Sequence, residues 1–323
     1  MDFELSEDQV ALVDGIRSLL QGRFDIETVR ATEHTGGIDR AGWNELAETG
    51  VFSLVVPEAD GGVGLGYGDA VLVFEELGRA LVPGPLVGTF LAAGLVEGAA
   101  SGEKLVGIIE RSGASGLPNV VEHLSSLDVL LVLDGEGVWQ VDPSTLVGTP
   151  FHMPLDPLTP ASVVDALPQG DKIAGSDVAD DLRVKGATIT SAFQLGLAEG
   201  ATELATAYAK ERQQFGKPIG QFQAIKHICA DMISRVEVCR AVVYMAGVSL
   251  DDPEVGDPAR AASSARIVAN NASSENGKDC VQVHGGMGYT WEVDAHLFVK
   301  RAWALATTFG SADEHAEQLA LTI

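Results

Sequence analysis

The chain has 323 residues, 46% of them hydrophobic, and its 21 basic and 46 acidic side chains give a formal net charge of −25. A chain of this length and hydrophobicity buries a substantial core in two or three domains, which excludes extensive disorder. The strong negative charge argues against nucleic acid or an anionic membrane surface as a partner, because both bind basic protein surfaces.

No pattern typical of secretion, membrane insertion or a metal site is present in the sequence. Met1–Glu4 lacks the basic start of a signal peptide, and the longest uncharged run, residues 80–96, is shorter than a membrane span of about 20 residues. None of the three cysteines has C-x-x-C spacing, and a sparse, odd number fits a reducing compartment. We therefore expect a cytoplasmic protein without a metal ion, in which residues 80–96 form a loop leading into a buried helix.

The first zone, residues 1–103, is predicted to be a helical domain. Ser6 and Gln9 form the S-x-x-Q pattern of a capping box, and apolar residues at helical spacing follow them. Two further helices are predicted around Trp43 and around Phe74, with a glycine-rich break between them.

The second zone, residues 104–185, is predicted to be a shortened β-domain. Apolar runs typical of short strands lie at 105–109, 129–133 and 138–141, with Gly, Pro, Asp and Ser between them. Seven prolines fall between positions 118 and 168, which excludes long helices there.

The third zone, residues 186–323, is predicted to be an antiparallel four-helix bundle. Asp257 followed by Pro258 is a strong helix start, and Gly285 with Gly286 is a strong helix stop. The four predicted helices span residues 189–214, 221–250, 257–283 and 294–321.

Two segments of the third zone carry residues suited to an anionic ligand. In the first, Arg212 ends a helix before a tight Gly-Lys-Pro turn, and its guanidinium suits a phosphate or pyrophosphate. Residues 200–240 hold six basic and four acidic side chains, a local excess of two positive charges in an acidic protein. In the second, glycines at 285–286 allow close approach of the backbone to a ligand. Taken singly, Arg212 also reads as an ordinary surface charge and the glycines as a helix cap.

Both segments resemble known flavin-binding sequences. R-x-x-F-G-x-x-I-x-x-F-Q-A-I at 212–225 and Q-V-H-G-G-M-G-Y-T at 282–290 are similar to the two C-terminal FAD-binding segments of acyl-CoA dehydrogenases. The opening residues 1–9, the P-E-x-x-G-G segment from Pro57 and the order of the three zones resemble that family too. The resemblance implies a mainly helical fold with a central β-domain, and an enzyme that desaturates acyl-CoA thioesters.

The resemblance also implies a cofactor site shared between subunits. In the family these segments hold the adenosine and pyrophosphate end of an FAD whose flavin ring lies in the neighbouring subunit. The residues at the matching positions, which we predict to bind FAD, are Arg212, Gln214, Phe215, Ile219, Phe222, Ile225, Gln282, Gly285 and Gly286.

The chain departs from the family where the chemistry occurs. The family uses a carboxylate to remove the α-proton, but Phe309 stands at its usual position and Gly186 at its alternative position. The nearby acids Asp313, Glu314 and Glu199 are interpreted as solvated or bundle-lining charges, so no catalytic residue is assigned. Segments resembling T-E-x-x-x-G-S-D and K-x-W-I-T-N, which hold the flavin ring in the family, are absent from the sequence.

This combination resembles the non-catalytic β chain of actinobacterial heterotetrameric acyl-CoA dehydrogenases of steroid side-chain degradation. The resemblance implies a homologous catalytic partner that carries the glutamate and binds most of the acyl-CoA, with an electron-transfer flavoprotein as acceptor. Two alternatives stay open: a self-sufficient homo-oligomer that uses a displaced acid such as Asp313 or Glu314, and a scaffold that binds no flavin.

Overall fold

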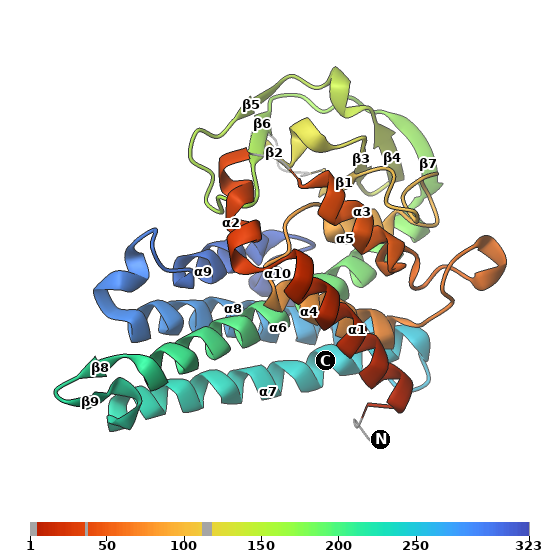
Figure 1. Ribbon diagram of the computed structural model, residues 1–323. Helices are drawn as coiled ribbons and strands as arrows, with labels where there is room; N and C mark the ends of the chain where they lie inside the picture. The colour runs from red at the N-terminus through yellow and green to blue at the C-terminus, as the bar shows by residue number, and fades with distance from the viewer. Residues whose placement is uncertain (1–4, 36–37, 112–117, 323) are drawn as a thin grey trace.

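The computed structural model describes residues 5–35, 38–111 and 118–322, and Figure 1 shows its small sheets lying over one side of a set of long helices. The predicted capping box is confirmed, because the Ser6 backbone N–H donates to Gln9 Oε1 at 3.1 Å and the Gln9 N–H donates to Ser6 Oγ at 3.2 Å. The predicted helix within residues 80–96 is confirmed too, and it is largely buried. The N-terminal helices are α1 (Glu7–Arg23), α2 (Ile26–Thr35), α3 (Arg40–Glu48), α4 (Tyr67–Arg79) and α5 (Leu86–Leu91). Met1–Glu4, part of the family-like opening, lie outside the described residues.

The central domain consists of two small sheets. The first has the order β1 (Val106–Glu110), β3 (Val129–Leu133), β4 (Gly137–Val141) and β7 (Asp171–Gly175). β1 runs parallel to β3, whereas the other pairs in this sheet are antiparallel. The second has the order β2 (Asn119–Glu122), β6 (Ala161–Val164) and β5 (Gly148–Pro150). The three predicted strands correspond to β1, β3 and β4, which include the most deeply buried strands of the domain.

The C-terminal helices form the bundle, and α4 packs closely against it. A side-chain carbon added at Gly78 would lie 2.0 Å from the Phe193 carbonyl oxygen, and one added at Gly196 would lie 1.9 Å from the Glu75 carbonyl oxygen. Glycine at these positions therefore lets the backbones of α4 and α6 approach each other. The bundle helices are α6 (Ser176–Glu211), α7 (Gln223–Asp251), α8 (Pro258–His284), α9 (Ala295–Ala304) and α10 (Ala312–Ala320).

The first bundle helix corrects a prediction, because α6 begins at Ser176 rather than near residue 189 and ends at Glu211 rather than 214. Acidic residues in its early turns form ion pairs with basic residues one turn later: Asp180 with Arg183 and Asp181 with Lys185, both at 2.6 Å. Such pairs support a helix through a segment that contains Gly186. The predicted start of the last domain, residue 186, therefore falls inside α6.

The last helix also corrects a prediction, because residues 294–321 form two helices rather than one. Phe309 and Gly310 have positive φ angles of 53° and 96°, which an α-helix does not accommodate. The buried Arg266 guanidinium donates to the carbonyl oxygens of Leu305, where a 3₁₀ turn begins, and of Thr308, which follows that turn. The break lies at Phe309, where the resemblance to acyl-CoA dehydrogenases places the base.

Candidate functional site: a cofactor half-site and a central cavity

The first predicted FAD segment forms a short hairpin that projects from the end of α6. β8 (Gln213–Gln214) pairs with β9 (Lys217–Pro218), and Phe215 and Gly216 between them both have positive φ angles, 51° and 77°. Two such residues form the tight turn that suits a two-residue hairpin. The Phe215 ring is 91% exposed. Arg212 and Gln214 are exposed, and the Arg212 side chain has no ion pair or hydrogen bond with any described residue.

The rest of this segment turns into the start of α7. Ile219 begins a 3₁₀ turn, and Phe222 precedes the first residue of α7. The Phe222 ring packs edge-to-face on the Phe215 ring with 6.0 Å between centroids, and the Lys217 ammonium lies 4.5 Å from the Phe222 centroid. Phe222 and Ile225 are half-buried, whereas Phe215 and Lys217 are exposed like Arg212.

The second predicted segment lies at the same end of the bundle, at the C-terminus of α8 (Figure 1). Gln282, Gly285 and Gly286 are exposed, and a side-chain carbon built at either glycine would meet nothing within 4 Å. His284 stacks on Tyr208 of α6 with ring centroids 4.1 Å apart, which ties the two segments together. All nine predicted residues are thus exposed or half-buried at one end of the bundle.

Apolar side chains that the sequence analysis did not single out extend this surface. Met287 is 40% exposed, Tyr289 85% and Trp291 51%, on the connection between α8 and α9. Exposed apolar side chains gathered in this way are typical of a surface that another protein covers.

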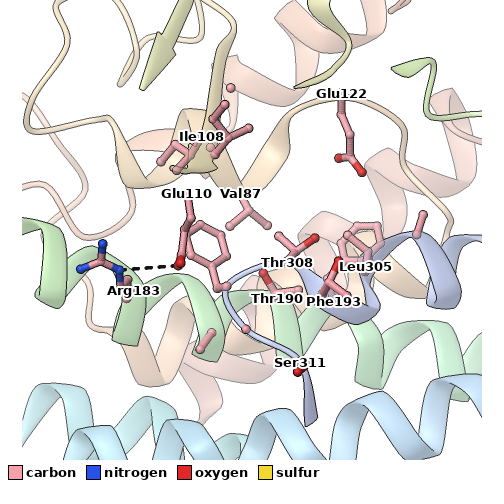
Figure 2. Close-up of a pocket in the computed structure, with 18 of the residues that line it drawn as sticks. Val87, Ile108, Glu110, Glu122, Arg183, Thr190, Phe193, Leu305, Thr308 and Ser311 are labelled. Atoms are coloured by element: carbon pink, nitrogen blue, oxygen red, sulfur yellow. Dashed lines mark ion pairs between the residues drawn. The ribbon is translucent and has the colours of Figure 1, made fainter. Parts of the chain in front are cut away.

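A separate cavity of about 1280 Å³ lies between the sheets and the helices (Figure 2). Its walls come from α5, β1, β2, α6, α8 and the broken segment between α9 and α10. Apolar side chains that line it include Val87, Ile108, Phe193, Leu305 and Phe309. Cavities of this size exceed the common range for small-molecule sites, about 300–1,000 Å³.

The two expected base positions meet at this cavity. A side-chain carbon added at Gly186 would lie 2.5 Å from the Phe309 ring, so the phenylalanine packs directly on the glycine. The Phe309 ring is 8% exposed. Neither position offers a proton acceptor, and the packing leaves no space for a carboxylate at residue 186.

The contact between Phe309 and Gly186 predicts how a substitution at residue 186 changes the stability of the fold. Gly186→Ala should destabilise the protein by about 1–3 kcal/mol, because the added methyl group overpacks the Phe309 ring. The matched control is Gly15→Ala on α1, where the added carbon meets nothing within 4 Å and removing glycine from a helix should be neutral or stabilising. Urea denaturation of both variants measures the difference, and equal stabilities would contradict the packing.

The acids considered from the sequence are poorly placed for catalysis. Glu314 lines the cavity, but its carboxylate accepts the Ser311 N–H and hydroxyl, both at 2.8 Å, and these bonds lower its pKa. Asp313 is exposed, and Glu199 pairs with Arg240 at 3.2 Å. Because hydrogen bonds stabilise its ionised form, the Glu314 carboxylate is a weaker proton acceptor than an ordinary glutamate.

Three cavity acids could not be picked out from the sequence: Glu110 on β1 and Glu122 on β2 (Figure 2), and the exposed Glu317 on α10. Burial raises the pKa of Glu110, and Arg183, 3.6 Å away, opposes the shift. Burial also raises the pKa of Glu122 to about 7. No local sequence pattern predicts that Glu110 and Glu122 line a cavity, because their burial depends on helices distant in the sequence.

The raised pKa of Glu122 predicts a pH-dependent stability. The folded protein holds this proton up to about pH 7, whereas the unfolded chain loses it near 4.5. Stability therefore falls as pH rises through that window and is level above it. Glu122→Gln should remove this loss, so the variant should gain on the order of 1–2 kcal/mol relative to wild type between about pH 5 and about pH 8. Chemical denaturation at the two pH values measures the free energy of unfolding of both proteins. The same difference between variant and wild type at both pH values would contradict a raised pKa at Glu122.

Comparison with known proteins places the chain in a family. Residues 6–103 match the N-terminal domain of acyl-CoA dehydrogenases and residues 178–323 match the C-terminal domain. The chain belongs to the acyl-CoA dehydrogenase family.

Among individual proteins, the chain is 35% identical to the acyl-CoA dehydrogenase IpdE2 of Mycolicibacterium smegmatis, over 98% of each sequence. The Tcur3481–Tcur3483 steroid ACAD shares the fold at a TM-score of 0.85 and 25% identity, over 97% of each chain. The ChsE4–ChsE5 complex of Mycobacterium tuberculosis does so at 0.85 and 24%, over 99% of this chain and 98% of the other. The predicted fold is therefore confirmed.

The predicted cofactor, FAD, is confirmed for this family, whose fold is known in FAD complexes. The exposed, unpaired Arg212 guanidinium and the open backbone at Gly285 and Gly286 fit the anionic dinucleotide end of FAD. Within the described residues, no group of His, Cys, Asp and Glu side chains could hold a metal ion. None of the described helices is both long and apolar enough to cross a bilayer.

Proposed function

We propose that this chain is the non-catalytic subunit of a heteromeric acyl-CoA dehydrogenase, and that it completes the FAD site of a homologous catalytic partner. The observation that carries the proposal is the packing of Phe309 on Gly186, which fills both positions where the family places its base. The uncovered half-site at the end of the bundle supports it, because Arg212 there lacks any partner within the described chain.

In this proposal the two subunits divide the work. The nine half-site residues bind the adenosine and pyrophosphate end of the cofactor, and Arg212 neutralises pyrophosphate charge. The partner supplies the glutamate and most of the acyl-CoA pocket. FAD, when bound, supplies the hydride acceptor for α,β-desaturation, and an electron-transfer flavoprotein then takes the electrons. The steroid ACAD among the similar structures supports a steroid side-chain CoA thioester as substrate.

Native mass spectrometry of the chain co-expressed with a homologous subunit that carries the glutamate tests this division. We expect two copies of each chain and one FAD for each pair. A flavin-loaded homo-oligomer of this chain would favour the self-sufficient alternative, and a stable complex without flavin would favour the scaffold. Either result would refute the shared-site proposal.

A further inference from the structure

The walls of the cavity contain buried polar atoms that have no partner in the described part of the chain. They are Thr190 Oγ1, His123 Nδ1 and Arg301 Nη2. The three residues are 0%, 3% and 4% exposed, respectively. All three residues line the cavity. An unpaired buried polar group costs about 1–3 kcal/mol, so three on the walls of one cavity require an explanation.

Arg301 is held rigidly, and its charge is already balanced. Its Nε donates to Asp156, and its Nη1 donates to the Val82 carbonyl oxygen at 3.2 Å. Asp156 also accepts the Leu158 N–H at 3.0 Å and the Thr159 hydroxyl at 2.7 Å. The free Nη2 therefore needs a hydrogen-bond acceptor, whereas the guanidinium needs no second anion.

The neighbouring groups disfavour a negatively charged ligand. Burial lowers the pKa of His123 to about 4, so its ring is neutral at pH 7. Glu122 projects into the cavity from β2 toward Leu305 and Phe193 (Figure 2), and its ionised form would repel an anion. His123 has a φ angle of 54°, a conformation that non-glycine residues adopt rarely and that often marks a functional position.

We propose that this cavity binds a neutral, largely apolar molecule through one accepting oxygen, such as a ketone or ester carbonyl, placed against Arg301 Nη2 and the Thr190 hydroxyl. The apolar walls enclose the remainder of the molecule, and the volume of about 1280 Å³ admits a large ring system. The bound molecule is not desaturated here, because Phe309 occupies the base position. This site lies apart from the exposed half-site, so the inference does not depend on FAD binding in the partner.

The test uses the full-length chain and three probes with the same ring: cyclododecanone, the hydrocarbon cyclododecane and the anion cyclododecanecarboxylate. Calorimetric titration should show the ketone binding about tenfold or more tightly than either of the others, because only the ketone offers a neutral acceptor. Equal binding of ketone and hydrocarbon would mean that water alone satisfies the unpaired polar atoms, and tighter binding of the carboxylate would mean an anion site; both overturn the proposal. Displacement of the ketone by FAD from the chain alone would overturn it as well.

Thr190→Val separates a binding role from a structural one. The variant should bind the ketone roughly threefold to tenfold more weakly, while the unliganded protein should unfold at a higher temperature because an unpaired hydroxyl is gone. The matched control is Thr188→Val, on the same helix, whose buried hydroxyl donates to the Val184 carbonyl oxygen at 3.0 Å. That control should leave ketone binding unchanged and should not raise the unfolding temperature.

Arg212→Ala distinguishes this inference from the proposed function. It should leave ketone binding unchanged, since Arg212 lies between α6 and the hairpin, at the end of the bundle, and does not line the cavity. Weaker ketone binding in Arg212→Ala, or unchanged binding in Thr190→Val, would refute the placement of the site.

Discussion

The purified chain alone should oxidise acyl-CoA thioesters at least about 10² to 10⁴-fold more slowly than the assembled pair, because it lacks a general base and should hold little flavin. Phe309 cannot accept the α-proton, and Gly186 has no side chain and lies against the Phe309 ring. Reduction of an artificial electron acceptor, measured with straight-chain, branched and steroid acyl-CoA thioesters, gives the two rates.

Two substitutions locate the base. Replacing the partner's glutamate by glutamine should abolish activity of the pair, while Glu122→Gln in this chain should leave it unchanged. Normal turnover by the chain alone would contradict the proposal. If Glu122→Gln or Glu314→Gln then removed that turnover, the chain would be self-sufficient with a displaced acid.

Arg212→Ala should weaken FAD binding by the complex about ten- to a hundredfold. The lost contact is a charge-assisted hydrogen bond of about 1.5–3 kcal/mol, and about 1.4 kcal/mol corresponds to a factor of ten. An ordinary surface ion pair would contribute at most about 1 kcal/mol, and the described residues offer Arg212 no such pair. Flavin fluorescence during titration of the apo complex with FAD measures the affinity.

Two matched variants separate a specific contact from general charge. Lys210→Ala removes an exposed positive charge in the last turn of α6, two residues before Arg212, and should change affinity little. Arg212→Lys keeps the charge but loses the planar fork, so it should fall between wild type and Arg212→Ala. Unchanged FAD affinity in Arg212→Ala, with the complex intact, would show that Arg212 does not bind the cofactor.

Local sequence signals predicted the features that depend on neighbouring residues. The capping box at Ser6 and the helix start at Asp257 act within one turn of helix, and both occur as predicted. A tight turn after Arg212 was also expected, at Gly-Lys-Pro, but the structure places it one residue earlier, at Phe215-Gly216, between two short strands. Each of these features depends only on residues within a few positions of one another in the chain, so a local sequence pattern is enough to indicate it.

Features that depend on distant contacts were not predictable from the sequence. The break after α9 requires the Arg266 guanidinium of α8, which lies 39 residues before Leu305 in the chain. The short strands β2, β5 and β6 are stabilised by pairing across long loops rather than by their own apolar pattern.

The unpaired polar atoms of the cavity show the same limit at the functional level. Thr190, His123 and Arg301 lie on α6, after β2 and on α9, and no spacing in the sequence relates them. The identities of Phe309 and Gly186 did indicate, from the sequence alone, that the chain lacks the base. The sequence could not indicate that these two residues are in contact, because that contact joins the first bundle helix to the break before α10.

Flavin absorbance of three preparations tests the central claim most directly: this chain alone, the catalytic homologue alone and the co-expressed pair, each after gel filtration in FAD. The shared-site account predicts stoichiometric flavin in the pair and little flavin in either chain alone. Full flavin occupancy of the homologue in the absence of this chain would contradict it, because the cofactor site would then be complete without Arg212 and its neighbours.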